Sequence, residues 1–232
     1  MKKHFIILFF TLIITSVYTA ETWLSAEYQY GFYFLKGEHL IDTIADKNDK
    51  YFKIGKNGMN IKTYTFWNNQ NIGLFTKTSL SFPYSNNNYQ KNYQFNNIVI
   101  PLSFGSGVGF RHSPSDKSSI YYAVGFNLNF YLVFAKSKNL RYLKSTNKKS
   151  YGHEFVFSLI SDIGYKYNIN NNVYLNVGTN LDFGFAKHIK HISPVESFYP
   201  EYSIKYSTTS KWAKGSFSFE FMPYIGVGFI IE

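Results

Sequence analysis

Apolar and polar or small residues alternate along most of this chain. In IYYAVGFNLNFYLVF, from Ile120 to Phe134, each second position starting at Ile120 is large and apolar for fifteen residues. A period of two predicts a β-strand whose two faces differ. Strands of ordinary globular sheets are usually about five or six residues long. The length of this segment therefore predicts a tall wall of sheet.

Seven further segments show the same alternation, which gives eight expected strands. The segment IKTYTFW is short and fits either register, and Pro223 lies on the apolar side of the last segment, where it predicts a local kink or bulge. The seven segments are LSAEYQYGFYF, IKTYTFW, IGLFTKTSLSF, IVIPLSFGSGVGF, EFVFSLISDIGYKYNI, VYLNVGTNLDFGFA and GSFSFEFMPYIGVGFIIE.

The connections between these segments alternate in length. Three are short and rich in turn-forming residues: NNQN, HSPSDKSS and NNN. The other four run roughly over residues 36–60, 83–97, 135–150 and 187–214. Short and long connections in alternation predict an up-and-down meander with two different ends. Pairing of the first strand with the last would close the barrel and remove its exposed edges.

The two faces of the expected strands differ in a way that indicates which one is wet. A soluble barrel would carry Lys, Glu and Thr outside, whereas here the face opposite the apolar set is rich in Gly, Ser and Asn. Small residues suit the narrow interior of an eight-stranded barrel, and a closed barrel can expose its apolar set to lipid. Tyr28, Phe34, Phe82, Tyr165 and Tyr167 are expected to form aromatic girdles at the membrane surfaces.

This combination of strand length, alternation and connection asymmetry over residues 22–232 resembles the small eight-stranded outer-membrane barrels of the OmpX, OmpA membrane domain and OmpW kind. The resemblance implies an all-β fold, a closed eight-stranded antiparallel up-and-down transmembrane barrel with short periplasmic turns and four long surface loops. It also implies a monomer inserted by the outer-membrane insertion machinery. That machinery reads a terminal aromatic in such families, whereas YIGVGFIIE keeps the alternation but closes with Glu232.

The first twenty residues predict an export signal rather than part of the barrel. Lys2 and Lys3 precede an apolar run from Phe5 to Ile14, and small residues suit cleavage near Ala20. The expected domains are therefore a signal peptide over 1–20 and a barrel over 21–232, in the cell outer membrane. The chain has no Cys, which excludes disulfides and a lipoprotein anchor.

The formal net charge of +10 concentrates in two of the long loops. We expect these loops to bind anionic ligands, either lipopolysaccharide-like headgroups or an anionic glycan or host surface ligand. The alternative is that the lysines only solvate the loops and contact the phosphates of the outer leaflet. The candidate binding residues are Lys136, Lys138, Arg141, Lys144, Lys148, Lys149, Lys187 and Lys190.

A second candidate cluster lies on the inward face of the last three expected strands. Glu154, Asp182 and Glu220 should lie at a similar height in neighbouring strands, as a charge cluster in the barrel interior. Like charges at close range disfavour ionisation unless a cation intervenes. The expected partner is Lys62 or a loop lysine, with a bound cation as the alternative.

Other chemistry has weaker support. The HIS tripeptide at 191–193 with Glu196 superficially resembles the His-x-Ser of lipid A deacylases, but its place in a long loop leaves the geometry unspecified. His188 and His191 would form half a metal site only if that loop were helical. We expect no enzyme, no cofactor, no metal and no nucleic-acid partner.

The sequence thus predicts a barrel with a packed lumen and a surface-exposed structural or adhesive role. The alternative is a narrow OmpW-like channel for ions or small apolar molecules, and a soluble periplasmic ligand-binding barrel is a third possibility.

Overall fold

The protein folds into one long β-barrel. The structure, a computed structural model, describes residues 20–36, 52–67, 70–90, 93–139, 148–194, 206–213 and 217–231. Within these ranges there is no helix long and apolar enough to cross a membrane. The strands are β1 (Ala20–Lys36), β2 (Phe52–Trp67), β3 (Ile72–Ser81), β4 (Tyr84–Gln90), β5 (Tyr93–Ser115), β6 (Ser118–Asn139), β7 (Lys148–Asn168), β8 (Val173–Pro194), β9 (Tyr206–Ala213) and β10 (Phe217–Ile231).

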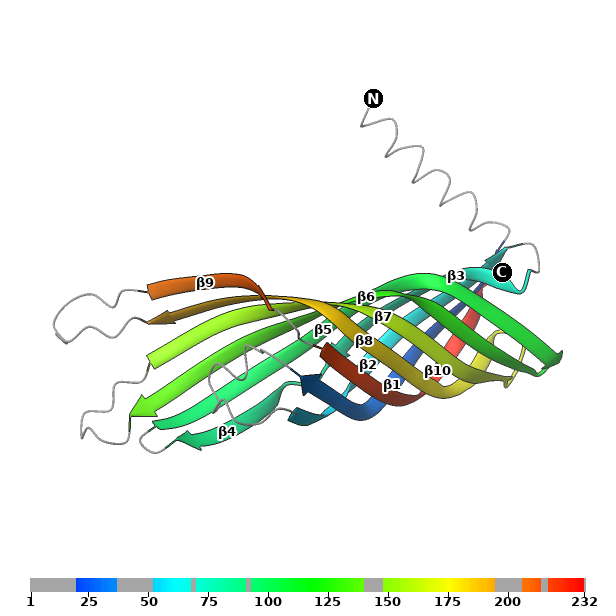
Figure 1. Cartoon of the computed structure of the whole chain (residues 1–232). Coiled ribbons are helices and arrows are strands. Elements are labelled where there is room, and N and C mark those ends of the chain that lie inside the picture. The colour runs from blue at the N-terminus through cyan, green and yellow to red at the C-terminus, as the bar shows by residue number, and fades with distance from the viewer. Residues whose placement is uncertain are drawn as a thin grey trace, which may run out of the picture.

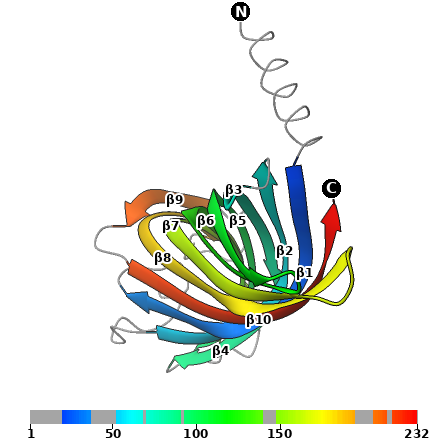
Figure 2. The same cartoon turned by 90° about the vertical axis from the view of Figure 1, so that its right-hand side faces the viewer.

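These ten strands make eight positions around a closed antiparallel barrel (Figures 1 and 2). β4 pairs with the part of β5 that lies beyond its pairing with β3, so β3 and β4 share one position. β9 and β10 share another beside β8. β10 pairs with both β8 and β1, which closes the barrel. The predicted fold, a closed eight-stranded up-and-down barrel, is confirmed.

The two ends of the barrel differ as predicted. The turns at 116–117 and 169–172 lie together with the end of β2, the start of β3 and the C-terminal end of β10 at what we call the short-turn end (Figure 1). At the opposite end, which we call the long-connection end, the sequence between successive strands is longer over 37–51, 140–147 and 195–205. The long loop expected over 83–97 is wrong, because β4 and the start of β5 occupy most of that range and pair with each other. β4 and β9 lie at the long-connection end and extend the wall there.

Large apolar residues face outward along the described strands, and polar or small residues face the lumen. On β2, where the sequence left the register open, Ile61 is 57% exposed and Lys62 is 1% exposed. Gly107 and Gly125 oppose each other on β5 and β6, and a Cβ on Gly107 would lie 2.6 Å from the Gly125 Cα. Glycine therefore lets these two strands approach closely. An apolar outer wall around a polar, filled interior is the arrangement of a barrel that is surrounded by lipid.

β8 is longer than predicted because a bulge hides its second half from a simple alternation pattern. In the β7–β8 ladder Ser158 faces Gly184 and Phe157 faces Ala186, so Phe185 is an extra residue. Before the bulge even-numbered residues face the lumen, and after it Lys187 and Ile189 do. The prediction of a loop starting at residue 187 is therefore wrong.

Pro223 interrupts pairing without changing register. The β1–β10 ladder pairs Gln29 with Tyr224 and then Phe32 with Phe221. The two positions of each strand between these pairs do not pair in this ladder. Because proline has no N–H to donate, the missing pairs have a simple cause. The predicted local irregularity is present as a gap and not as a bulge.

Candidate functional site

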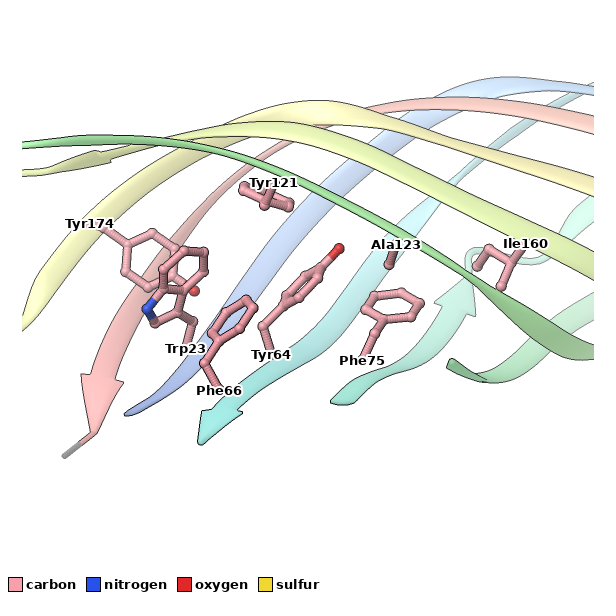
Figure 3. Packing of buried hydrophobic residues seen from close by; sticks show 8 residues of the cluster. All are labelled: Trp23, Tyr64, Phe66, Phe75, Tyr121, Ala123, Ile160 and Tyr174. Atoms are coloured by element: carbon pink, nitrogen blue, oxygen red, sulfur yellow. The ribbon is translucent and has the colours of Figure 1, made fainter. Parts of the chain in front are cut away.

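The lumen is filled at the short-turn end by a layer of aromatic side chains. Their rings point toward one another across the barrel interior (Figure 3). The Trp23 and Phe66 ring centroids lie 4.9 Å apart, as do those of Tyr64 and Phe75. This aromatic layer consists of six aromatic residues, packed together with Ala123 and Ile160: Trp23, Tyr64, Phe66, Phe75, Tyr121 and Tyr174.

Two cations and one carboxylate flank the aromatic layer. The Arg111 guanidinium forms an ion pair with Glu21 and lies 4.5 Å from the centre of the Phe66 ring. The Lys166 ammonium lies 3.6 Å from the centre of the Trp23 ring. Cations attract the faces of aromatic rings. The layer is therefore held by charges as well as by ring packing.

A buried charge cluster lies deeper in the barrel and joins opposite walls. Lys62 Nζ of β2 is 2.8 Å from Glu27 Oε2 of β1 and 3.0 Å from Asp162 Oδ1 of β7. The Tyr64 hydroxyl donates a hydrogen bond to Asp162, and the Lys62 ammonium lies 3.2 Å from the centre of the Tyr224 ring. Since β2 and β7 are not neighbours in the sheet, the Lys62–Asp162 pair crosses the lumen.

A second set of cross-lumen bonds is centred on Glu220. Lys56 Nζ is 2.8 Å from Glu220 Oε2, and the Tyr131 hydroxyl donates to the same carboxylate. The rings of Tyr33 and Tyr131 stack with their centroids 5.3 Å apart. These contacts join β1, β2, β6 and β10, so the lumen is bridged here as well.

The structure places the three predicted interior carboxylates inside the barrel, but not in one layer. Asp182 and Glu220 are directly paired, whereas Glu154 is paired with Ile189, seven positions further along β8. The expectation of a similar height is therefore wrong for Glu154, whose Oε1 lies 3.4 Å from Lys187 Nζ. Asp182 accepts hydrogen bonds from the side chains of Asn127 and Asn129.

Lysines accompany the buried carboxylates throughout the described lumen. Lys62 was expected to pair with the cluster of Glu154, Asp182 and Glu220. Instead it forms ion pairs with Glu27 and Asp162, which the sequence analysis did not single out. The sequence did show that Glu27 and Asp162 lie on the inward face of their segments. It did not show how far along the barrel axis each of them lies. The buried groups are Glu27, Glu154, Asp162, Asp182 and Glu220 with Lys56, Lys62, Lys77, Lys166 and Lys187. Five negative and five positive formal charges balance, and no His, Cys, Asp and Glu grouping suited to a metal occurs among the described residues.

The residues predicted to bind anions are distributed over several places. Lys136 and Lys138 belong to β6, and Lys148 and Lys149 to β7, where the backbone ladder pairs Lys136 with Lys149. Lys190 lies on β8 and is partly exposed. Arg141 and Lys144 lie outside the described residues.

The prediction that Lys187 binds an anionic ligand from a surface loop is wrong. It lies on β8 after the bulge, faces the lumen and is 2% exposed beside Glu154. A buried, paired ammonium is not available to an external anion. The surface position expected for Lys187 is therefore wrong.

His191 and Ser193 also lie on β8, and not in a loop as expected. The helical spacing that a metal pair of His188 and His191 would need is absent, since this segment is a strand. Glu196 lies outside the described residues.

Comparison with known proteins identifies a fold and no family. No family model matches the chain, and no curated protein matches it either. Among solved structures, a major outer membrane protein from Thermus thermophilus superposes with a TM-score of 0.57 at 11% identity, covering 90% of this chain and 99% of that one. The chain has the fold of an outer-membrane β-barrel. This agrees with the resemblance inferred from the sequence.

Two other solved structures superpose less well. OprG from Pseudomonas aeruginosa gives a TM-score of 0.49 at 8% identity, with 92% of this chain and 97% of that chain covered. The attachment invasion locus protein Ail of Yersinia pestis gives 0.45 at 14% identity, with 90% and 98% covered.

Proposed function

We propose that this protein is an outer-membrane anchor that presents its long-connection end at the cell surface, where basic residues bind anionic ligands. The observation that carries the proposal is the filled lumen. Ion pairs, hydrogen bonds and stacked rings cross the barrel at several heights, from the Arg111–Glu21 pair to the Lys56–Glu220 pair. These contacts across the lumen stabilise the barrel and leave its interior filled. The ligand-binding surface is therefore expected outside the lumen.

The distribution of charge supports an anionic ligand at the long-connection end. Among the described residues every Asp and Glu either faces the lumen or belongs to the short-turn end. The pairing of Lys136 with Lys149 brings basic positions of β6 and β7 together next to connection 140–147. Uncompensated cations attract polyanions through long-range fields that salt screens.

Removing the basic cluster of β6, β7 and their connection should weaken binding of a sulfated polysaccharide by about tenfold or more at low salt. The variant replaces Lys136, Lys138, Arg141, Lys144, Lys148 and Lys149 with Gln, and Lys117→Gln at the short-turn end serves as the control. Binding of fluorescent dextran sulfate is measured on intact cells and on refolded protein.

We expect wild-type binding to fall with added salt and the control to behave as wild type. Equal binding by the six-residue variant would contradict a ligand role for the cluster. Binding by refolded protein but not by intact cells would contradict the proposed orientation.

The filled lumen also gives an expected result for the alternative function, a narrow channel. Pure refolded protein in a planar lipid bilayer should show no discrete conductance openings, because an eight-stranded barrel has an interior just wide enough for its own side chains. Regular openings of the wild-type protein that disappear on boiling would favour the channel and contradict the anchor.

A further inference from the structure

Three basic side chains lie on the outer wall of the barrel near the long-connection end. They are His153 of β7 and His188 and Lys190 of β8, and we call them the outer basic patch. The bulge at Phe185 places the two β8 residues outside, because it turns their odd-numbered neighbours Lys187 and Ile189 into the lumen. The patch therefore lies on the face of the wall opposite to the lumen charges.

The three side chains lie close enough together to contact one anion. His153 faces Lys190 directly in the β7–β8 ladder, and His188 occupies the adjacent outward row, opposite Phe155. Side chains that face each other in such a ladder have Cβ atoms about 5 Å apart, and diagonal neighbours about 7–8 Å. The His188 Nε2 also lies 3.1 Å from the Ser210 hydroxyl of β9. The patch therefore offers imidazole, ammonium and hydroxyl groups over a small area.

No carboxylate of the described residues neutralises this patch. The described acidic residues all face the lumen or lie at the short-turn end. A protonated imidazole directly opposite an ammonium is unfavourable unless an anion lies between or beside them. Imidazole N–H and ammonium groups are the donors that bind phosphate oxygens with short, charge-assisted hydrogen bonds.

Aromatic side chains surround the patch. His188 packs edge-on against Trp212 at 5.2 Å between ring centroids, and Trp212 in turn stacks on Phe157 at 6.1 Å. His153 contacts Phe155, with centroids 5.0 Å apart. Trp212 is 60% exposed on the outer wall. Exposed aromatic residues of this kind form the girdles at which a barrel meets lipid headgroups.

We propose that the outer basic patch binds the phosphate of an anionic lipid headgroup in the surrounding leaflet. His153, His188 and Lys190 donate to the phosphate, while Trp212 packs against the upper part of the acyl chains. The lipid is the occupant because the patch lies on the apolar outer wall and within an aromatic girdle, where a dissolved anion would meet lipid first. This goes beyond the proposed surface function and rests only on its membrane placement.

The test compares lipids that differ only in their phosphates. The protein is folded in micelles of a detergent without phosphate. Bisphosphorylated lipid A, or the same lipid after dephosphorylation, is then titrated while thermal unfolding is followed. The patch variant is H153N/H188N/K190Q. The matched control is H112N/K117Q, which removes the same residue types at the short-turn end.

We expect phosphorylated lipid A to raise the unfolding temperature of the wild type and of the control, and the patch variant to bind it about tenfold more weakly or worse. An equal response to dephosphorylated lipid, or an unchanged response in the patch variant, would overturn the proposal. An equal shift with inorganic phosphate alone would identify a site for free anions instead of lipid. If the triple variant fails to fold, the single variant K190Q provides the same comparison. Lys190 is partly exposed at the outer wall, so we expect this change to leave folding intact.

Failure of this proposal is distinguishable from failure of the surface function. The six-residue variant of the β6–β7 connection should keep its response to lipid A, and H153N/H188N/K190Q should keep its binding of dextran sulfate. If either variant lost both responses, the patch and the loop cluster would form one site, and the assignment of a separate lipid site would be wrong.

Discussion

Replacing Lys62 with Met should lower the free energy of unfolding by about 3–5 kcal/mol, because it leaves buried carboxylates without their cation. Lys62 is held between Glu27 and Asp162, at 2.8 and 3.0 Å, and its side chain is completely buried. Methionine fills much of the lysine volume, so the loss reports on charge more than on packing. The measurement is urea unfolding of the barrel in micelles, followed by tryptophan fluorescence.

A compensated variant separates charge from packing. Adding Glu27→Gln and Asp162→Asn to Lys62→Met removes the stranded charges and should restore most of the lost stability. Lys117→Met, at an exposed turn position, is expected to change the free energy by no more than about 0.5 kcal/mol. If Lys62→Met were as stable as the wild type, the cross-lumen cluster would have no role in holding opposite walls together.

The fold was predictable because one strong constraint acts along the whole chain. Lipid outside and a narrow lumen inside require opposite side chains on the two faces, so alternation, strand number and turn positions could be derived from the sequence. The length of β8 could not be derived, because the bulge at Phe185 reverses the alternation and makes a continuous strand look like a strand end. That error moved Lys187 from the lumen to a loop.

The sequence predicted that the buried carboxylates would have cationic partners, but not which lysine would pair with which carboxylate. The inward face of each expected strand showed that carboxylates would be buried, and electrostatics then required cations. Which lysine serves which acid depends on how neighbouring strands are staggered and on contacts across the barrel, such as Lys62 of β2 with Asp162 of β7. Alternation along one strand carries no information about either, which is why Glu154 was placed at the wrong height.

Replacing Phe126 with Arg should destabilise the barrel in a bilayer by about 2–4 kcal/mol. Phe126 is 69% exposed and lies near the middle of the outward apolar series of β6, between Ile120 and Phe134. An arginine at that depth faces hydrocarbon, where its charge is poorly solvated. The measurement is reversible urea unfolding in vesicles of a short-chain phosphatidylcholine.

Depth provides the control for Phe126→Arg. Tyr167, also exposed on the outer wall, lies next to the short-turn end, and Tyr167→Arg is expected to cost about 0–1 kcal/mol because it meets headgroups and water. A soluble barrel would behave in the opposite way, since an exposed phenylalanine replaced by arginine improves a water-facing surface. Equal effects at the two depths, or a gain in stability at Phe126, would therefore contradict the lipid environment from which the surface function and the lipid site both follow.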